Sequence, residues 1–155
     1  MKKRISIVSI IMIFLFLLSG CRNTILPDLP KDAIAFEIRT FEDTKHDIAL
    51  FGSIEYNGRV YIPFGTINNS YRQNLVDSCI GYIIQDENSS SVVDPDNKDR
   101  RIYIMKEDDE HNFLMEYDDT VKLMNQPDFY RAIDTNGKDI VIPDYISSFG
   151  YAFWK

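Results

Sequence analysis

Residues that many small folds and enzyme sites depend on are scarce in this sequence. It holds two cysteines, two histidines and seven glycines. Two cysteines cannot form the dense disulfide scaffold of a small secreted domain. Seven glycines leave little backbone for a phosphate-binding loop, and no HExxH, CxxC or GxSxG motif occurs. These absences make the common metal-dependent, redox and hydrolytic site types poor explanations for the chain.

Positive charge is also scarce. The chain has 17 Lys and Arg against 24 Asp and Glu, and its net charge is −7. Lys2, Lys3 and Arg4 lie in the first 20 residues and no acid precedes Asp28, so the remainder carries about −10. Phosphate backbones are bound by clustered Lys and Arg. We therefore expect no nucleic-acid partner.

The first 21 residues form three consecutive segments. A cationic head is followed by a 14-residue apolar run from 5 to 18, broken only by two serines. As a helix this run would extend roughly 21 Å, short of the roughly 30 Å hydrocarbon core of a bilayer. It suits a signal peptide better than a permanent membrane span. Leu18-Ser19-Gly20-Cys21 follows directly.

This ending resembles the lipobox of bacterial lipoproteins, and the chain as a whole resembles the small lipoproteins of low-GC Gram-positive bacteria. The resemblance implies cleavage before Cys21 and lipidation of its thiol by diacylglycerol carrying fatty acids such as palmitate. Two acyl chains suffice for stable anchoring. It thus implies a signal peptide at 1–20, a lipid anchor and Pro-containing tether at 21–31, and one globular domain at 32–155 on the extracytoplasmic face of the cell membrane. An uncleaved anchor with a chance cysteine is the alternative.

Strand signals dominate the domain. Alternating apolar residues and the turn dipeptides Asn57-Gly58 and Asn136-Gly137 predict hairpins. Short helices are predicted over 70–79, after a capping-box pattern at Ser70, and over 143–150. The fold class is therefore mainly β or α+β, an antiparallel and barrel-like sheet with one or two short helices. The predicted strands are 33–39, 47–56, 59–64, 80–84, 101–106, 112–117, 129–134 and 138–142. The predicted core includes Phe36, Val60, Ile62, Phe64, Ile83, Ile102, Ile104 and Phe113.

Candidate reactive residues are few. His46 and His111 each stand beside carboxylates, a pairing that serves metal ligation or general base catalysis but also occurs in solvated turns. The segment 94–99 places oxygen ligands at calcium-loop spacing, yet lacks the sharp-turn glycine and the closing glutamate. Cys79 runs into an apolar strand pattern, which favours a buried small hydrophobe over a reactive thiol. We therefore assign no catalytic, cofactor-binding or metal-binding residue.

Acidic residues gather most densely at Asp108, Asp109 and Glu110, which we identify as a candidate acidic binding patch. Its field would attract a cationic peptide or protein. The expected function is a non-catalytic, lipid-anchored binding or interaction protein, a class that includes protection of the cell against a toxin or antimicrobial peptide. Two alternatives stay open: an envelope enzyme using a His–carboxylate pair, and a structural or assembly component of an envelope complex.

Overall fold

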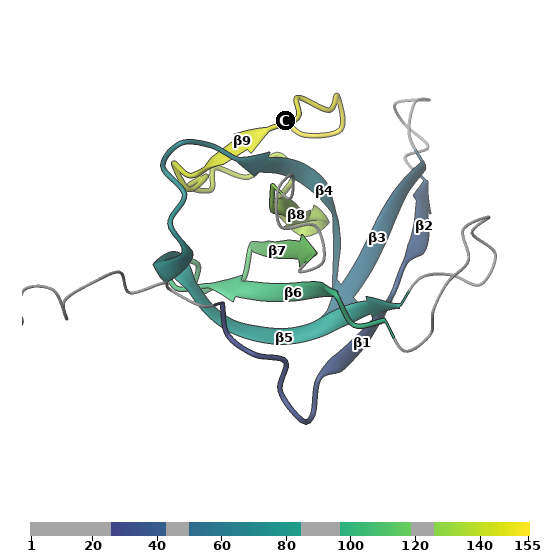
Figure 1. The fold of residues 1–155 in the computed structure, drawn as a ribbon. Coiled ribbons are helices and arrows are strands. Elements are labelled where there is room, and N and C mark those ends of the chain that lie inside the picture. Colours follow the sequence, from purple (N-terminus) through teal and green to yellow (C-terminus); the bar gives the residue numbers. More distant parts are fainter. Residues whose placement is uncertain (1–25, 43–49, 85–96, 119–125) are drawn as a thin grey trace, which may run out of the picture.

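The computed structural model describes residues 26–42, 50–84, 97–118 and 126–155 (Figure 1). Half of the described residues are in strands, and no described helix reaches seven residues, so the fold is mainly β as predicted. The strands are β1 (Ile34–Glu37), β2 (Arg39–Glu42), β3 (Leu50–Tyr56), β4 (Arg59–Ile67), β5 (Val76–Ile84), β6 (Arg100–Met105), β7 (Phe113–Asp118), β8 (Asp128–Ala132) and β9 (Ile146–Ser148). Two 3-10 turns, η1 (Gln73–Leu75) and η2 (Ile133–Thr135), complete the elements.

The strands form one curled sheet in the order β1-β5-β6-β7-β8-β4-β3-β2, and β9 pairs with β4 off this path. All pairs are antiparallel except β1 with β5. The two ends of the path, β1 and β2, are separated along the chain only by Ile38. The curl therefore brings the ends of the sheet back to one another, which gives the half-barrel seen in Figure 1.

Both faces of the sheet are apolar, because the inner face lines the half-barrel and the outer face is covered by other segments. The inner core draws one or two residues from each of seven strands, namely Phe36, Ile54, Tyr61, Ile83, Ile102, Leu114, Tyr130 and Ala132. The outer core is Phe64, Val76, Cys79, Tyr103, Met105, Phe113, Met115, Phe129, Tyr145 and Ile146, against which Leu26, Leu75, Ile140 and Trp154 pack. Strands buried on both faces lose clean alternation of apolar and polar residues.

Two predicted hairpins are confirmed. Asn57 and Gly58 have φ values of 50° and 73°, as a type I′ turn requires, and join β3 to β4. β6 and β7 form the second hairpin. Six of the eight predicted core residues are buried, whereas Val60 and Ile104 are only half-buried.

The helix predicted over 70–79 is confirmed only as the 3-10 turn η1, and the helix predicted over 143–150 is wrong. Val76 and Cys79 lie on β5, where the register shifts between Val76 and Ser78 and again between Cys79 and Gly81. Each shift adds a residue to the strand, so the buried Val76 and Cys79 lie three residues apart, a spacing that imitates a helix. Residues 146–148 of the second predicted helix form β9 instead.

The predicted hairpin around Asn136-Gly137 is also wrong. Gly137 has the expected positive φ of 74°, but Asn136 does not share it, and residues 138–142 form no strand. The reason lies in β8, whose two edges already pair with β4 and β7. No edge is left for a returning strand.

The C-terminal segment fills a split between β3 and β4. Their pairing ends at Ile54 and Tyr61, and Pro63 two residues later has no N–H to donate to β3. The Phe149 N–H bonds the Phe64 carbonyl at 2.9 Å, and the Trp154 indole N–H bonds the Pro63 carbonyl at 3.2 Å. The tail thus satisfies carbonyls that the departing strand leaves open.

Trp154 also covers a buried cation on the outer face. The Arg131 guanidinium carbon lies 4.7 Å from the centroid of the Trp154 ring and 5.3 Å from that of Phe64. Two of its nitrogens donate to the hydroxyl and carbonyl oxygens of Thr135. Burial lowers the pKa of Arg131 from its ordinary value. Cation–π contacts of this desolvated kind contribute about 2 kcal/mol.

Candidate functional site

The acidic turn between β6 and β7 contains the predicted binding patch, and its first acid is not on the surface. Asp108 is 8% exposed. Its two carboxylate oxygens accept the backbone N–H groups of Asn112 and Phe113 at 2.9 and 2.6 Å. The patch assignment is therefore corrected for Asp108, since its charge is used to close its own turn. Asp109 and Glu110 are exposed and present their charge to solvent.

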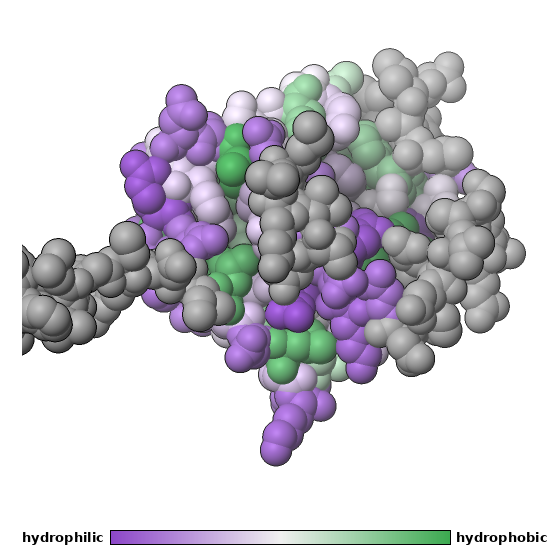
Figure 2. Space-filling model, viewed as in Figure 1, coloured by the Kyte–Doolittle hydropathy of each residue, from purple (hydrophilic) through white to green (hydrophobic). Residues whose placement is uncertain are grey.

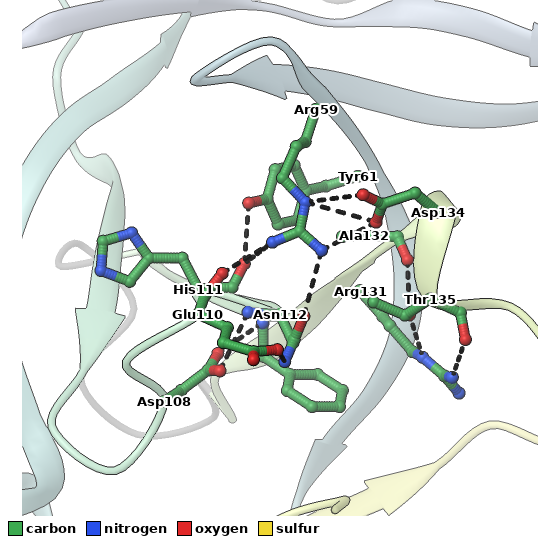
Figure 3. Close-up of polar contacts among 11 residues, drawn as sticks. Arg59, Tyr61, Asp108, Glu110, His111, Asn112, Arg131, Ala132, Asp134 and Thr135 are labelled. Atoms are coloured by element: carbon green, nitrogen blue, oxygen red, sulfur yellow. Dashed lines mark hydrogen bonds and ion pairs between the residues drawn. The ribbon is translucent and has the colours of Figure 1, made fainter. Parts of the chain in front are cut away.

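Arg59 ties this turn to two other parts of the half-barrel. It begins β4, directly after the Asn57-Gly58 turn, and its side chain reaches across the end of the sheet (Figure 3). Nε and Nη2 donate to the Asp134 carboxylate, the shortest distance being 2.7 Å. Nη1 donates to the carbonyls of Glu110 and His111, and Nη2 also donates to the Asn112 side-chain oxygen at 3.0 Å.

These contacts decide what Arg59 can do chemically. A guanidinium has five N–H groups, and the partners just described occupy all five. The hydrogen bond from Arg59 is the main cause that lowers the pKa of Asp134, and the same bond raises the pKa of Arg59. With no donor left over for a substrate, Arg59 acts as a structural clamp.

His111 enters this cluster through its backbone and not through its ring. Its carbonyl accepts the Tyr61 hydroxyl at 2.7 Å as well as Arg59. Its imidazole points away from the cluster (Figure 3) and lies 6.0 Å from the Tyr56 ring, between ring centroids. Burial is the main cause that raises the pKa of Tyr61 to about 12. The described geometry therefore gives the imidazole no carboxylate partner of the kind that a His–carboxylate enzyme needs.

A second polar cluster lies toward the opposite end of the sheet. Glu116 on β7 accepts Arg100 Nε at 2.6 Å with one oxygen and the Tyr130 hydroxyl at 2.8 Å with the other. Arg100 lies on β6 and Tyr130 on β8, so the cluster joins three neighbouring strands. Burial, followed by the nearby Glu116 charge, raises the pKa of Asp128. Arg100 and Glu116 are partly buried, and their pairing offsets the cost of removing two charges from water.

The remaining candidates have simpler outcomes. Cys79 is buried, and burial raises the pKa of its thiol, which confirms the small-hydrophobe interpretation. Among the described residues, no group of three or more His, Cys, Asp or Glu side chains could hold a metal ion. Cys21, His46 and residues 94–96 of the 94–99 segment lie outside the described residues.

An open cavity lies where β1 faces β3. Its volume is about 380 Å³, within the usual range for ligand sites. Phe36 and Tyr56 meet edge-on here, with ring centroids 6.2 Å apart. Arg39 lines the cavity. Its Nη2 lies 3.4 Å from the Glu37 carboxylate, and its Nη1 lies 3.7 Å from that of Glu55. The lining residues are Ile34, Ala35, Phe36, Glu37, Arg39, Glu55, Asn57 and Gly58. We call this cavity the seam.

Figure 2 shows one face of the molecule, on which the described side chains are mostly hydrophilic. In the space-filling view, hydrophobic side chains of the described residues emerge only as separate small areas (Figure 2). Along the described chain, no helix has both the length and the apolar character needed to cross a membrane.

No protein-family model, no curated protein and no solved structure matches the chain. The site must therefore be interpreted from its own residues.

Sequence analysis missed both Arg59 and the seam. Arg59 and Asp134 are 75 residues apart, and no local pattern links them. The seam forms because the segment Ile34–Glu42 pairs first with β5 and then with β3. That change of partner is a property of the curled sheet as a whole. The one usable signal was Asn57-Gly58, which correctly placed the hairpin whose tip lines the seam.

Proposed function

We propose that this protein is a non-catalytic, lipid-anchored binding protein on the extracytoplasmic face of the cell membrane, and that its ligand is a cationic peptide or protein segment. The anchor is supported by the resemblance of residues 1–21 to a lipoprotein signal peptide with Cys21 as the lipidated residue. The binding role is carried by a single observation: the described cavity is rimmed by exposed carboxylates on an acidic chain.

The polar clusters support binding over catalysis. The side chains of Arg59, Asp108 and Glu116 form hydrogen bonds with other parts of the protein. A catalytic group needs a donor, acceptor or lone pair free for substrate. The seam differs, because the side chains of Glu37, Arg39 and Glu55 are 69%, 68% and 56% exposed. Exposed ion pairs contribute at most about 1 kcal/mol, so the seam carboxylates exchange partners easily.

Two experiments test the two halves of the proposal. Metabolic labelling with an alkyne fatty acid should mark the protein, and Cys21→Ser should abolish the label; a label retained in that variant would overturn the anchor. For binding, a Lys-rich peptide titrated onto the full chain should lose affinity steeply as salt rises from about 50 to 500 mM, because the Debye length falls below about 10 Å. Salt-independent binding, or none, would overturn the cationic ligand.

A further inference from the structure

The pairing of the segment Ile34–Glu42 changes at Ile38. Before it, β1 pairs with β5; after it, β2 pairs with β3 in a register that joins Arg39 to Ser53. Continuing that register would place Glu37 opposite Glu55, but β1 has already turned to β5. The two stretches therefore face one another across the seam without forming a ladder.

Each wall of the seam carries an open strand edge. Within the described part of the chain, β1 pairs only with β5, and residues Ile54–Tyr56 of β3 pair only with β4. Open edges present N–H and C=O groups that a further strand can use. β1 can approach β5 closely only because residue 81 is a glycine. A Cβ at Gly81 would lie 2.1 Å from the Ile34 carbonyl oxygen.

We infer that the seam binds an extended cationic peptide by adding it as a strand to the open edge of β1. This inference rests on the proposed function and specifies how the same site would work. Main-chain hydrogen bonds to β1 would supply affinity, as in other cases of strand addition. The 42% exposed Ile34 side chain offers an apolar contact, and Glu37 and Glu55 select basic side chains.

Arg39 occupies the position at which a cationic side chain of the ligand would bind. Its guanidinium lies between Glu37 and Glu55, and all three side chains are well exposed. A basic ligand side chain would compete with it for the same carboxylates. Removing Arg39 should therefore tighten binding, whereas removing either carboxylate should weaken it.

The test uses the full chain in a neutral detergent and an amidated eight-residue peptide of alternating Lys and Val. The control peptide has the same sequence with an N-methyl group on every residue, which keeps the side-chain charge and removes every main-chain N–H donor that strand pairing needs. Strand addition predicts at least a tenfold loss of affinity for the methylated peptide, because several main-chain hydrogen bonds are lost. It also predicts slowed amide exchange at residues 34–37 when the unmethylated peptide binds.

Variants locate the site. Glu55→Gln should weaken binding about two- to fivefold and Arg39→Ala should strengthen it by a similar factor, as expected for exposed ion pairs. Asp139→Asn and Arg72→Ala change the same charges at exposed positions outside the seam lining and should leave affinity within twofold.

The outcomes separate the inference from the proposed function. Salt-sensitive binding of both peptides with equal affinity would overturn strand addition and leave cationic binding intact. Equal effects of Glu55→Gln and Asp139→Asn would overturn the seam as the site. Failure of both peptides to bind would overturn the inference and the proposed function together.

Discussion

Replacing Arg59 by alanine tests whether the most densely bonded polar cluster is structural. The change leaves the Asp134 carboxylate, the carbonyls of Glu110 and His111 and the Asn112 side chain without their shared donor. Hydrogen bonds contribute about 0.5–1.5 kcal/mol each. The contribution of the carboxylate pair is reduced by solvent, since Asp134 is about half exposed. We expect a loss of about 2–4 kcal/mol in the free energy of unfolding.

Urea unfolding measures this loss, with an unchanged m-value showing that the folded state is intact. Arg59→Lys should recover less than half of it, because an ammonium cannot reproduce the planar fork. Arg72→Ala is the matched control. Among the described residues, that guanidinium bonds the carbonyls of Asn69 and Tyr71 in its own exposed turn, so its removal should cost less than about 0.5 kcal/mol.

The same cluster predicts a pH dependence. The pKa of Asp134 is lowered from its ordinary value of 3.8, chiefly by the hydrogen bond from Arg59. A lowered folded-state pKa stabilises the protein above pH 3.8, and the stabilisation is lost as the pH falls below that value toward the folded pKa. The stability difference between wild type and Asp134→Asn should shrink over that range.

The outcome that would contradict a structural role for Arg59 is also clear. If its guanidinium were reserved for a ligand, Arg59→Ala would abolish binding with little loss of stability.

Three further substitutions test the fold. Gly58→Val should cost about 1–2 kcal/mol by urea unfolding through backbone strain alone, because φ is +73° and nothing lies within 4 Å of the added Cβ; a neutral result would refute the turn. Gly81→Ala should cost more than about 2 kcal/mol and speed amide exchange in β1, because its Cβ meets the carbonyl oxygen of Ile34. Trp154→Ala should lower the free energy of unfolding by about 2–3 kcal/mol, because it uncovers Arg131 and removes a ring contact with Phe64. A melting temperature unchanged within 1–2 °C would show that the C-terminal segment does not stabilise the fold at the split between β3 and β4.

Local chemistry decided which parts of the fold the sequence could predict. The Asn57-Gly58 turn was predictable because positive φ is a property of those two residues. The helix expected over 70–79 is only the three-residue turn η1, because two bulges in β5 changed the spacing of the apolar residues from Val76 onward, and no local rule places a bulge. The hairpin after β8 failed for a long-range reason, since β4 and β7 already occupy both edges.

The candidate site depended still more on long-range structure. Asp108 belongs to an acidic run that is indistinguishable in sequence from a solvated patch, yet it closes its own turn and is buried. The carboxylates of the seam, Glu37 and Glu55, come from strands that the sheet brings together only when it curls. Composition led us to propose a cationic partner, whereas it gave no indication of where such a partner would bind.

Photo-crosslinking most directly tests the central claim that the seam receives an extended cationic ligand. The alternating Lys–Val peptide, carrying a benzophenone side chain, is irradiated with the full chain in detergent, and the crosslinked residues are mapped by mass spectrometry. The account predicts crosslinks within residues 34–37 and in the Asn57-Gly58 turn, which decline as salt rises and are lost with the N-methylated peptide. Crosslinks confined to other segments, or unchanged by N-methylation, would contradict it.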